Sequence, residues 1–116
     1  MESKQLYDLG EENYNLTIPS SSEKKANQIG DGLGEILKRK GFEHLMVKDR
    51  EKSTSETYTK DNISAGIRVK GKSRNHKDYK TIVSLSSENL WNNPEFQGLV
   101  GTIDNYRINM GTEAVN

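Results

Sequence analysis

Cysteine is absent from the 116-residue chain, which excludes disulfides, thiolate metal sites and a cysteine nucleophile. Proline is scarce, with two residues, and no apolar run approaches the length that spans a bilayer. The stretch Met1–Asn15 is too acidic and polar to be a signal peptide. We therefore expect a soluble, cytoplasmic protein with no membrane partner.

An excess of charge of one sign is lacking too, since 17 basic and 17 acidic side chains leave a formal net charge of zero. Electrostatic steering of the whole chain towards nucleic acid is not indicated, and only local patches can recognise an anion. Hydrophobic residues make up 31% of the chain, so the core must be small. The length fits one domain over residues 1–116, in which we expect 1–13 and 112–116 to be loose ends.

The first predicted helix covers Ser22–Lys40. Ser20 and Glu23 have the spacing of a capping box, and Gly41 suits the left-handed position just after the helix. Between these ends, apolar residues recur in steps of three and four on one stripe: Ala26, Ile29, Leu33, Ile36 and Leu37.

Three glycines, Gly30, Gly32 and Gly34, lie in the interior of this helix, where each costs about 1 kcal/mol relative to alanine. The run superficially resembles a phosphate-binding loop, but it lacks a preceding buried strand and a Lys-Ser/Thr pair. Helix packing is the better interpretation. We expect another backbone, such as that of the sheet, to approach this face closely.

A second helix is predicted over Pro94–Asn109, because Asn93 suits the N-cap and Pro94 suits the first helical position. Its apolar residues have helical spacing: Phe96, Leu99, Val100, Ile103 and Tyr106. Trp91, the only tryptophan, precedes this helix and could either cover the core or act as an exposed anchor for a protein partner.

Alternating apolar and polar residues predict strands, most clearly over 63–70 and 79–85. Weaker candidates are 14–18, which Pro19 should stop, 42–47 and 53–60. We expect an α+β fold, with a small antiparallel sheet of three to five strands packed by an N-terminal and a C-terminal helix. The predicted core is Ile29, Leu33, Ile36, Leu37, Val47, Ile67, Val69, Val83, Leu85, Phe96, Leu99, Val100 and Ile103.

The most distinctive feature is a basic hairpin over residues 68–80, which contains six basic residues and a single acidic residue, Asp78. Its predicted partner-binding residues are Arg68, Lys70, Lys72, Arg74, His76, Lys77 and Tyr79, together with Trp91 outside the hairpin. The cations could contact nucleic acid, with Tyr79 stacking on a base, or an acidic protein surface. Alternatively, they could only keep an edge hairpin soluble.

Nothing in the sequence indicates an enzyme, a cofactor or a metal site. His44 and His76 are the only imidazoles, and neither has the further ligands that zinc requires. The serines lie in no nucleophile-elbow setting, and the acids show no spacing suited to paired acid–base catalysis.

Several segments resemble one family of Cas9-inhibiting anti-CRISPR proteins. They are Ser53-Thr54-Ser55 with Tyr58, then Ile67-Arg68-Val69 with His76, and finally Thr81-Ile82-Val83-Ser84. The N-terminus differs, because it carries Glu2, Asp8, Glu11 and Glu12 where that family has an arginine-rich segment. The resemblance implies a small phage or mobile-element protein that binds host machinery stoichiometrically in the host cytoplasm.

The leading hypothesis is therefore a non-enzymatic anti-defence inhibitor that binds a host defence protein, or its complex with nucleic acid, through the basic hairpin. The alternative is an autonomous nucleic-acid-binding module. The oligomeric state stays open.

Overall fold

The computed structural model describes residues 11–50, 53–70 and 79–110. The elements follow in the order β1 (Glu11–Ser20), α2 (Glu23–Arg39), β2 (Glu43–Arg50), β3 (Ser53–Lys60), β4 (Ile63–Lys70), β5 (Tyr79–Glu88), the short 3-10 helix η1 (Leu90–Asn92) and α3 (Pro94–Asn109). The predicted α+β class is confirmed. None of the helices in these ranges is long and apolar enough to cross a bilayer.

The five strands form one antiparallel sheet in the order β1-β5-β4-β3-β2. Strands β2 to β5 pair in sequence order as an antiparallel meander. Strand β1 pairs with β5 and so places the first strand of the chain beside the last. As a result β5, like β3 and β4, is an interior strand, hydrogen-bonded on both sides, while β1 and β2 are the edges.

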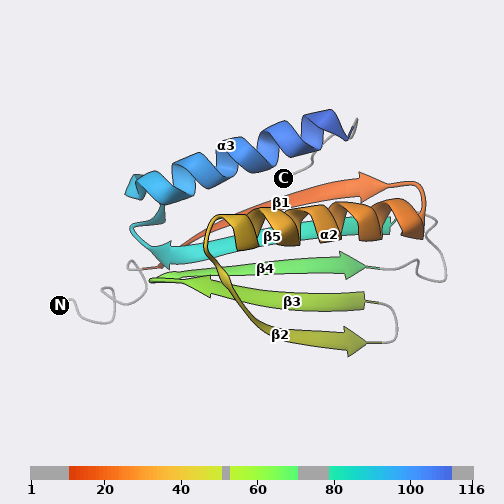
Figure 1. Ribbon diagram of the computed structural model, residues 1–116, viewed down its shortest axis with the longest axis horizontal. Coiled ribbons are helices and arrows are strands. Elements are labelled where there is room, and N and C mark those ends of the chain that lie inside the picture. The colour runs from red at the N-terminus through yellow and green to blue at the C-terminus, as the bar shows by residue number, and fades with distance from the viewer. Residues whose placement is uncertain (1–10, 51–52, 71–78, 111–116) are drawn as a thin grey trace.

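Both helices pack on the same face of the sheet. Figure 1 shows α2 lying across β5 and β4, with α3 running beside it near β1. Buried residues of α2, α3 and the strands form one core cluster, in which Leu33, Val83 and Leu99 are almost fully buried. Further residues, outside the predicted core list, are buried as well: Leu16, Ile18, Ala26, Phe42, Tyr58, Ile63, Ala65, Thr81 and Leu90.

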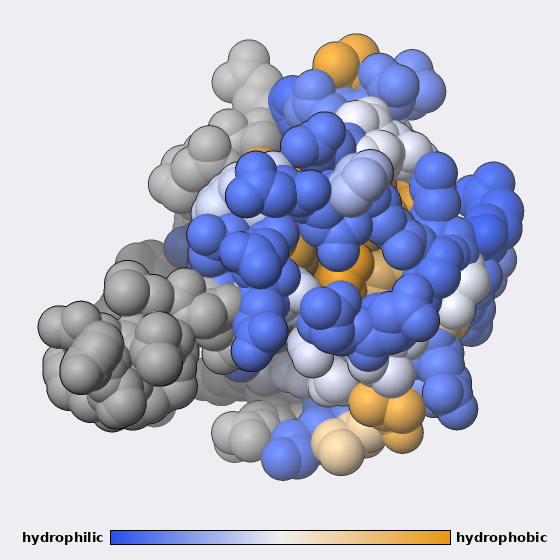
Figure 2. All heavy atoms as spheres, turned by 90° about the vertical axis from the view of Figure 1, so that its left-hand side faces the viewer, coloured by the Kyte–Doolittle hydropathy of each residue, from blue (hydrophilic) through white to orange (hydrophobic). Residues whose placement is uncertain are grey.

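The prediction of Val47 in the core is wrong, because its side chain is 49% exposed. Strand β2 is one of the two edge strands, and α2 lies over β5 and β4 rather than over it (Figure 1). The neighbouring Leu45 and Met46 are exposed as well. Figure 2 shows an apolar cluster at the bottom of the view, on the side of the molecule where β2 lies. Val69 and Val100, also predicted in the core, are only partly buried.

Helix α2 begins two residues later than a capping box with Ser20 as N-cap predicts. Ser22 is the N-cap, and its side chain accepts a 3.1 Å hydrogen bond from the Lys25 amide. Ser20 instead ends β1, which begins at Glu11 and runs through Pro19. Proline is tolerated there because β1 is an edge strand, where a missing N–H need not break the ladder. Gly41 has a φ of +95° after the helix, as predicted.

The three glycines of α2 make room for side chains, not for a second backbone as predicted. A Cβ at Gly30 would lie 2.8 Å from the Val69 side chain, and one at Gly34 would lie 2.7 Å from the Tyr58 hydroxyl. A Cβ at Gly32 would overlap the Tyr106 hydroxyl of α3. The glycines therefore set how closely α2 approaches the sheet and α3.

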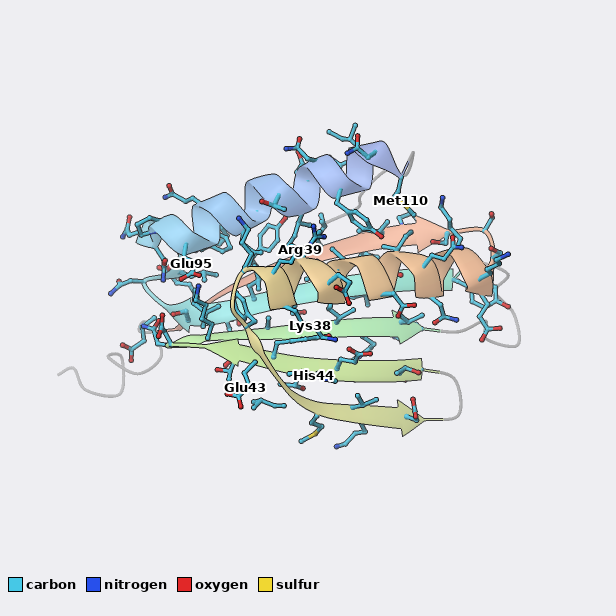
Figure 3. All side chains as sticks on the ribbon, in the orientation of Figure 1. Lys38, Arg39, Glu43, His44, Glu95 and Met110 are labelled. Atoms are coloured by element: carbon cyan, nitrogen blue, oxygen red, sulfur yellow. The ribbon has the colours of Figure 1, made fainter. Side chains whose placement is uncertain are left out.

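Lys60, at the end of β3, joins the two helices. Its ammonium donates a 2.6 Å hydrogen bond to the carbonyl of Lys40, after α2, and pairs with Glu95 in the first turn of α3. Figure 3 shows Glu95 at the start of α3, near the end of α2 that carries Lys38 and Arg39. The Lys60 ammonium thus interacts both with the negative C-terminal end of α2 and with the acid at the positive N-terminal end of α3.

Candidate binding surface of the sheet

The candidate site lies on the face of the sheet opposite α2 and α3, which we call the open face. Within the described ranges no element packs on it. Strand alternation and register assign the following residues to it, given strand by strand in the order β1, β5, β4, β3 and β2: Asn13, Asn15, Thr17, Pro19; Lys80, Ile82, Ser84, Ser86, Glu88; Ser64, Gly66, Arg68, Lys70; Ser53, Ser55, Thr57, Thr59; and Glu43, Met46, Lys48. Hydroxyl and amide side chains dominate this surface.

Three exposed cations, Arg68, Lys70 and Lys80, gather at one end of the open face and form what we call the cation cluster. Lys70 and Lys80 are direct cross-strand partners on β4 and β5. Their Cβ atoms are therefore about 5 Å apart, and Arg68 is about 7 Å further along β4. Lys48 on β2 lies in the same cross-strand row as Arg68, so positive charge continues from the cation cluster to the β2 edge of the sheet.

The cations of the cluster have no acidic partner in the part of the chain that the structure describes. The ion pairs in that part join Lys60 with Glu95 and Arg107 with Asp104, and Glu56 lies 3.5 Å from the His44 ring. The acids of the open face, Glu43 and Glu88, lie at the opposite ends of their strands. Lys80 and Glu88 are eight residues apart on β5, roughly 27 Å. The open face is therefore positive at one end and negative at the other.

A hollow of about 460 Å³ opens next to the cation cluster, lined by Asn15, Ser55, Glu56, Thr57, Gly66, Ile67, Arg68, Ile82 and Ser84. It forms because one cross-strand row consists of small residues, with Gly66 between Ser84 and Thr57. Ser84 donates a 2.7 Å hydrogen bond to the Asn15 side chain across the hollow. The hollow thus offers donors and acceptors, with the guanidinium of Arg68 at its rim.

Arg68 and Lys70 lie together on this face, as the sequence predicts. Tyr79 does not join them, because it pairs with Ser20 and shares the helix-side face of β5 with Thr81 and Val83. Tyr79 therefore lies on the face of β5 opposite the cations, and its stacking on a base stays a prediction. The predicted site residues Lys72, Arg74, His76 and Lys77 lie outside the described residues.

Trp91 lies in η1, beyond the far end of β5 and on the helix side of the sheet. Its ring makes edge-on contacts with Tyr14 and Phe96, at centroid distances of 6.4 and 5.1 Å, while 49% of the residue is exposed. It partly covers the core and also presents apolar surface. Its position separates it from the cation cluster by most of the length of β5.

Sequence reasoning missed Lys80 and the residues of the hollow as site members. The parity of β5 could have revealed Lys80, because it alternates with the buried Thr81, Val83 and Leu85. The hollow could not be found in this way. It depends on the register that brings Gly66 opposite both Ser84 and Thr57.

A second polar group, on the helix side, joins the edge strand β2 to β3. The His44 ring stacks on Tyr58 at a centroid distance of 4.7 Å, and its Nε2 lies 3.5 Å from Oε1 of Glu56. Burial and the Glu56 carboxylate, which accepts a hydrogen bond from the Tyr58 hydroxyl, raise the pKa of Tyr58. Across the described ranges, no group of three or more His, Asp or Glu side chains could hold a metal ion.

No protein-family model matches this chain, and comparison with curated proteins finds no match.

Proposed function

We propose that this protein is a non-enzymatic, phage-type anti-defence inhibitor that acts in the host cytoplasm. It binds a host defence protein, or that protein's complex with nucleic acid, through the open face of its sheet. The cation cluster supplies attraction to anionic groups, and the hydroxyl and amide side chains around the hollow supply hydrogen bonds. A surface of this composition suits recognition by contact rather than chemistry on a bound substrate.

The observation that carries this proposal is the place of the cations in the sheet. Lysines on an edge hairpin protect a sheet from edge-to-edge aggregation. Here β4 and β5 are interior strands, each paired on both sides, so Arg68, Lys70 and Lys80 guard no edge. Protection of an edge therefore does not explain them, which supports an anionic partner.

The direct test is an inhibition titration. Purified protein is added to a guide-loaded Cas9 complex that cleaves a labelled DNA duplex, with several Cas9 orthologues tried in parallel. The proposal expects inhibition of at least one complex that is complete near one protein per complex, as for a stoichiometric binder. Cleavage of the nuclease or its guide by substoichiometric protein would contradict the non-enzymatic proposal. Undiminished cleavage across the orthologues, together with unchanged phage plating on defended hosts, would contradict the anti-defence proposal.

The second candidate, an autonomous nucleic-acid-binding module, is favoured by the cation cluster alone. It requires affinity for naked DNA or RNA that falls steeply with salt, as counterions are released. Single-strand binders also use aromatic side chains as stacking platforms. Among the described residues, the open face carries none. Fluorescence anisotropy with labelled oligonucleotides at low and moderate salt separates the two functions.

A further inference from the structure

The opposition of Lys70 and Lys80 is unfavourable in the free protein. Like charges directly across a strand pair destabilise a sheet. This pair lies on two interior strands of the open face, β4 and β5, and no described carboxylate neutralises it. A bound anion between the two ammonium groups would remove this repulsion.

Two further groups make the position suitable for an anion. Ser53 lies directly opposite Lys70, and Ser55 lies directly opposite Arg68. Both hydroxyls can donate hydrogen bonds towards an anion held by the cations. The guanidinium of Arg68, two residues from Lys70, has the planar fork that pairs with a carboxylate through two parallel hydrogen bonds.

We infer that Lys70, Lys80 and Arg68 form an anion subsite that takes carboxylates of an acidic segment of a protein partner. This inference rests on the proposed function and names the chemistry that the open face recognises. The adjoining hollow would receive neutral side chains of the same segment, since its lining combines hydroxyl and amide side chains with Ile82 and carries Arg68 as its one open-face charge.

Two observations favour carboxylates of a protein over phosphates of a nucleic acid. A nucleic-acid strand carries negative charge along its whole length, yet the open face ends in Glu43 and Glu88, which would repel it. The described part of the open face also offers no aromatic ring for a base. A protein segment can instead place acids over the cluster and neutral or basic groups over the far end, which matches both signs of charge.

The experiment uses a ten-residue oligoglutamate peptide as the probe and a ten-nucleotide oligo-dT as the comparison, both at low salt. Affinity is measured by anisotropy, and amide chemical shifts locate the bound probe. We expect tighter binding of the peptide, with shifts centred on Gly66, Arg68, Lys70 and Lys80. Equal or tighter binding of the oligonucleotide would overturn the choice of a protein partner. Absence of peptide binding, or shifts centred elsewhere, would overturn the subsite.

The Lys80→Glu variant provides a signature that a solely structural role would not give. It replaces a like-charge pair by an ion pair with Lys70, so the melting temperature should rise by about 1–4 °C. Peptide affinity should nevertheless fall about tenfold or more, because the subsite loses a cation and gains an anion. Lys24→Glu, the same charge change on the exposed first turn of α2, should leave peptide affinity unchanged.

Equal loss in the two variants would show attraction by net charge only and overturn the subsite. Retained affinity in Lys80→Glu would overturn it as well. The proposed function fails separately, because peptide binding with this signature can stand even if no defence complex is inhibited.

Discussion

The hydroxyl of Tyr58 donates a 2.6 Å hydrogen bond to Oε1 of Glu56, its neighbour two residues earlier on β3. The pair lies on the helix side of the sheet, where the Tyr58 ring also stacks on His44. Gly34 of α2 provides the space for the hydroxyl. This small polar group connects the edge strand β2, the next strand β3 and helix α2, on the side of the sheet opposite the cations.

The Tyr58→Phe variant tests this connection. It keeps the ring stacked on His44 but removes the donor to Glu56. We expect the free energy of unfolding at pH 7 to fall by about 1 kcal/mol, because Glu56 remains partly exposed and water can replace the lost donor. Urea unfolding followed by circular dichroism measures the change, and an unaltered or increased stability would contradict the role given to the bond.

The raised pKa of Tyr58 and of two other tyrosines predicts that the free energy of unfolding falls at alkaline pH. Burial raises the pKa of Tyr14, Tyr58 and Tyr106 above the ordinary value of 10.0. Above pH 10 the unfolded chain loses these protons while the folded chain keeps them, so the folded state binds more protons. Stability should therefore be unaffected by these groups below pH 10 and fall as the pH rises above it.

Tyr58→Phe isolates the contribution of one tyrosine from that of the lysines, which titrate in the same range. The difference in unfolding free energy between the parent protein and the variant should shrink from pH 9 to pH 11. A constant difference would mean that the pKa of Tyr58 is not raised in the folded state.

Glycine-to-alanine changes in the two helices should have opposite effects. In α2, Gly32→Ala and Gly34→Ala meet the hydroxyls of Tyr106 and Tyr58 and should destabilise the protein by about 1–3 kcal/mol. In α3, a Cβ at Gly98 meets nothing within 4 Å, so Gly98→Ala should stabilise it by about 0.5–1 kcal/mol. Thermal melts of the three variants check this. Stabilisation by all three would show that α2 is not closely packed at its glycines.

The pairing of Lys60 with Glu95 should contribute to the joint between the helices. Lys60→Met retains the aliphatic stem, and Glu95→Gln retains the shape of the acid. We expect each change to cost about 1 kcal/mol, since both side chains are only partly exposed. A double-mutant cycle should then give a coupling energy of about 0.5–1 kcal/mol. Additive effects of the two changes would contradict a direct interaction.

The sequence predicts the helices and most strands well, because their apolar residues have clear periods of 3.6 and 2. Helix α2 and helix α3 are recognisable from residues such as Leu33 and Leu99, which repeat on one stripe. The exposure of the apolar residues of β2 cannot be predicted in this way. Leu45, Met46 and Val47 are apolar in sequence, but whether a helix covers them depends on where α2 crosses the sheet.

The candidate site was only half predictable for a related reason. Alternation assigns Arg68 and Lys70 to the wet face of one strand, and Lys80 to the wet face of the next. To predict that Lys70 lies directly opposite Lys80, one must know the register of β4 and β5, which eight residues of the chain separate. The interior position of β5 requires the long-range pairing of β1 with β5, which no local pattern specifies.

The central claim, that the open face binds the partner, is tested most directly by one pair of variants in the inhibition titration. Arg68→Ala removes a cation from the open face, and Lys38→Ala removes one from the exposed surface of α2, labelled in Figure 3. Both should melt like the parent protein, because solvated surface charges contribute little to stability. The account predicts that Arg68→Ala weakens the inhibitor about tenfold or more while Lys38→Ala has no effect. Undiminished inhibition by Arg68→Ala would contradict it.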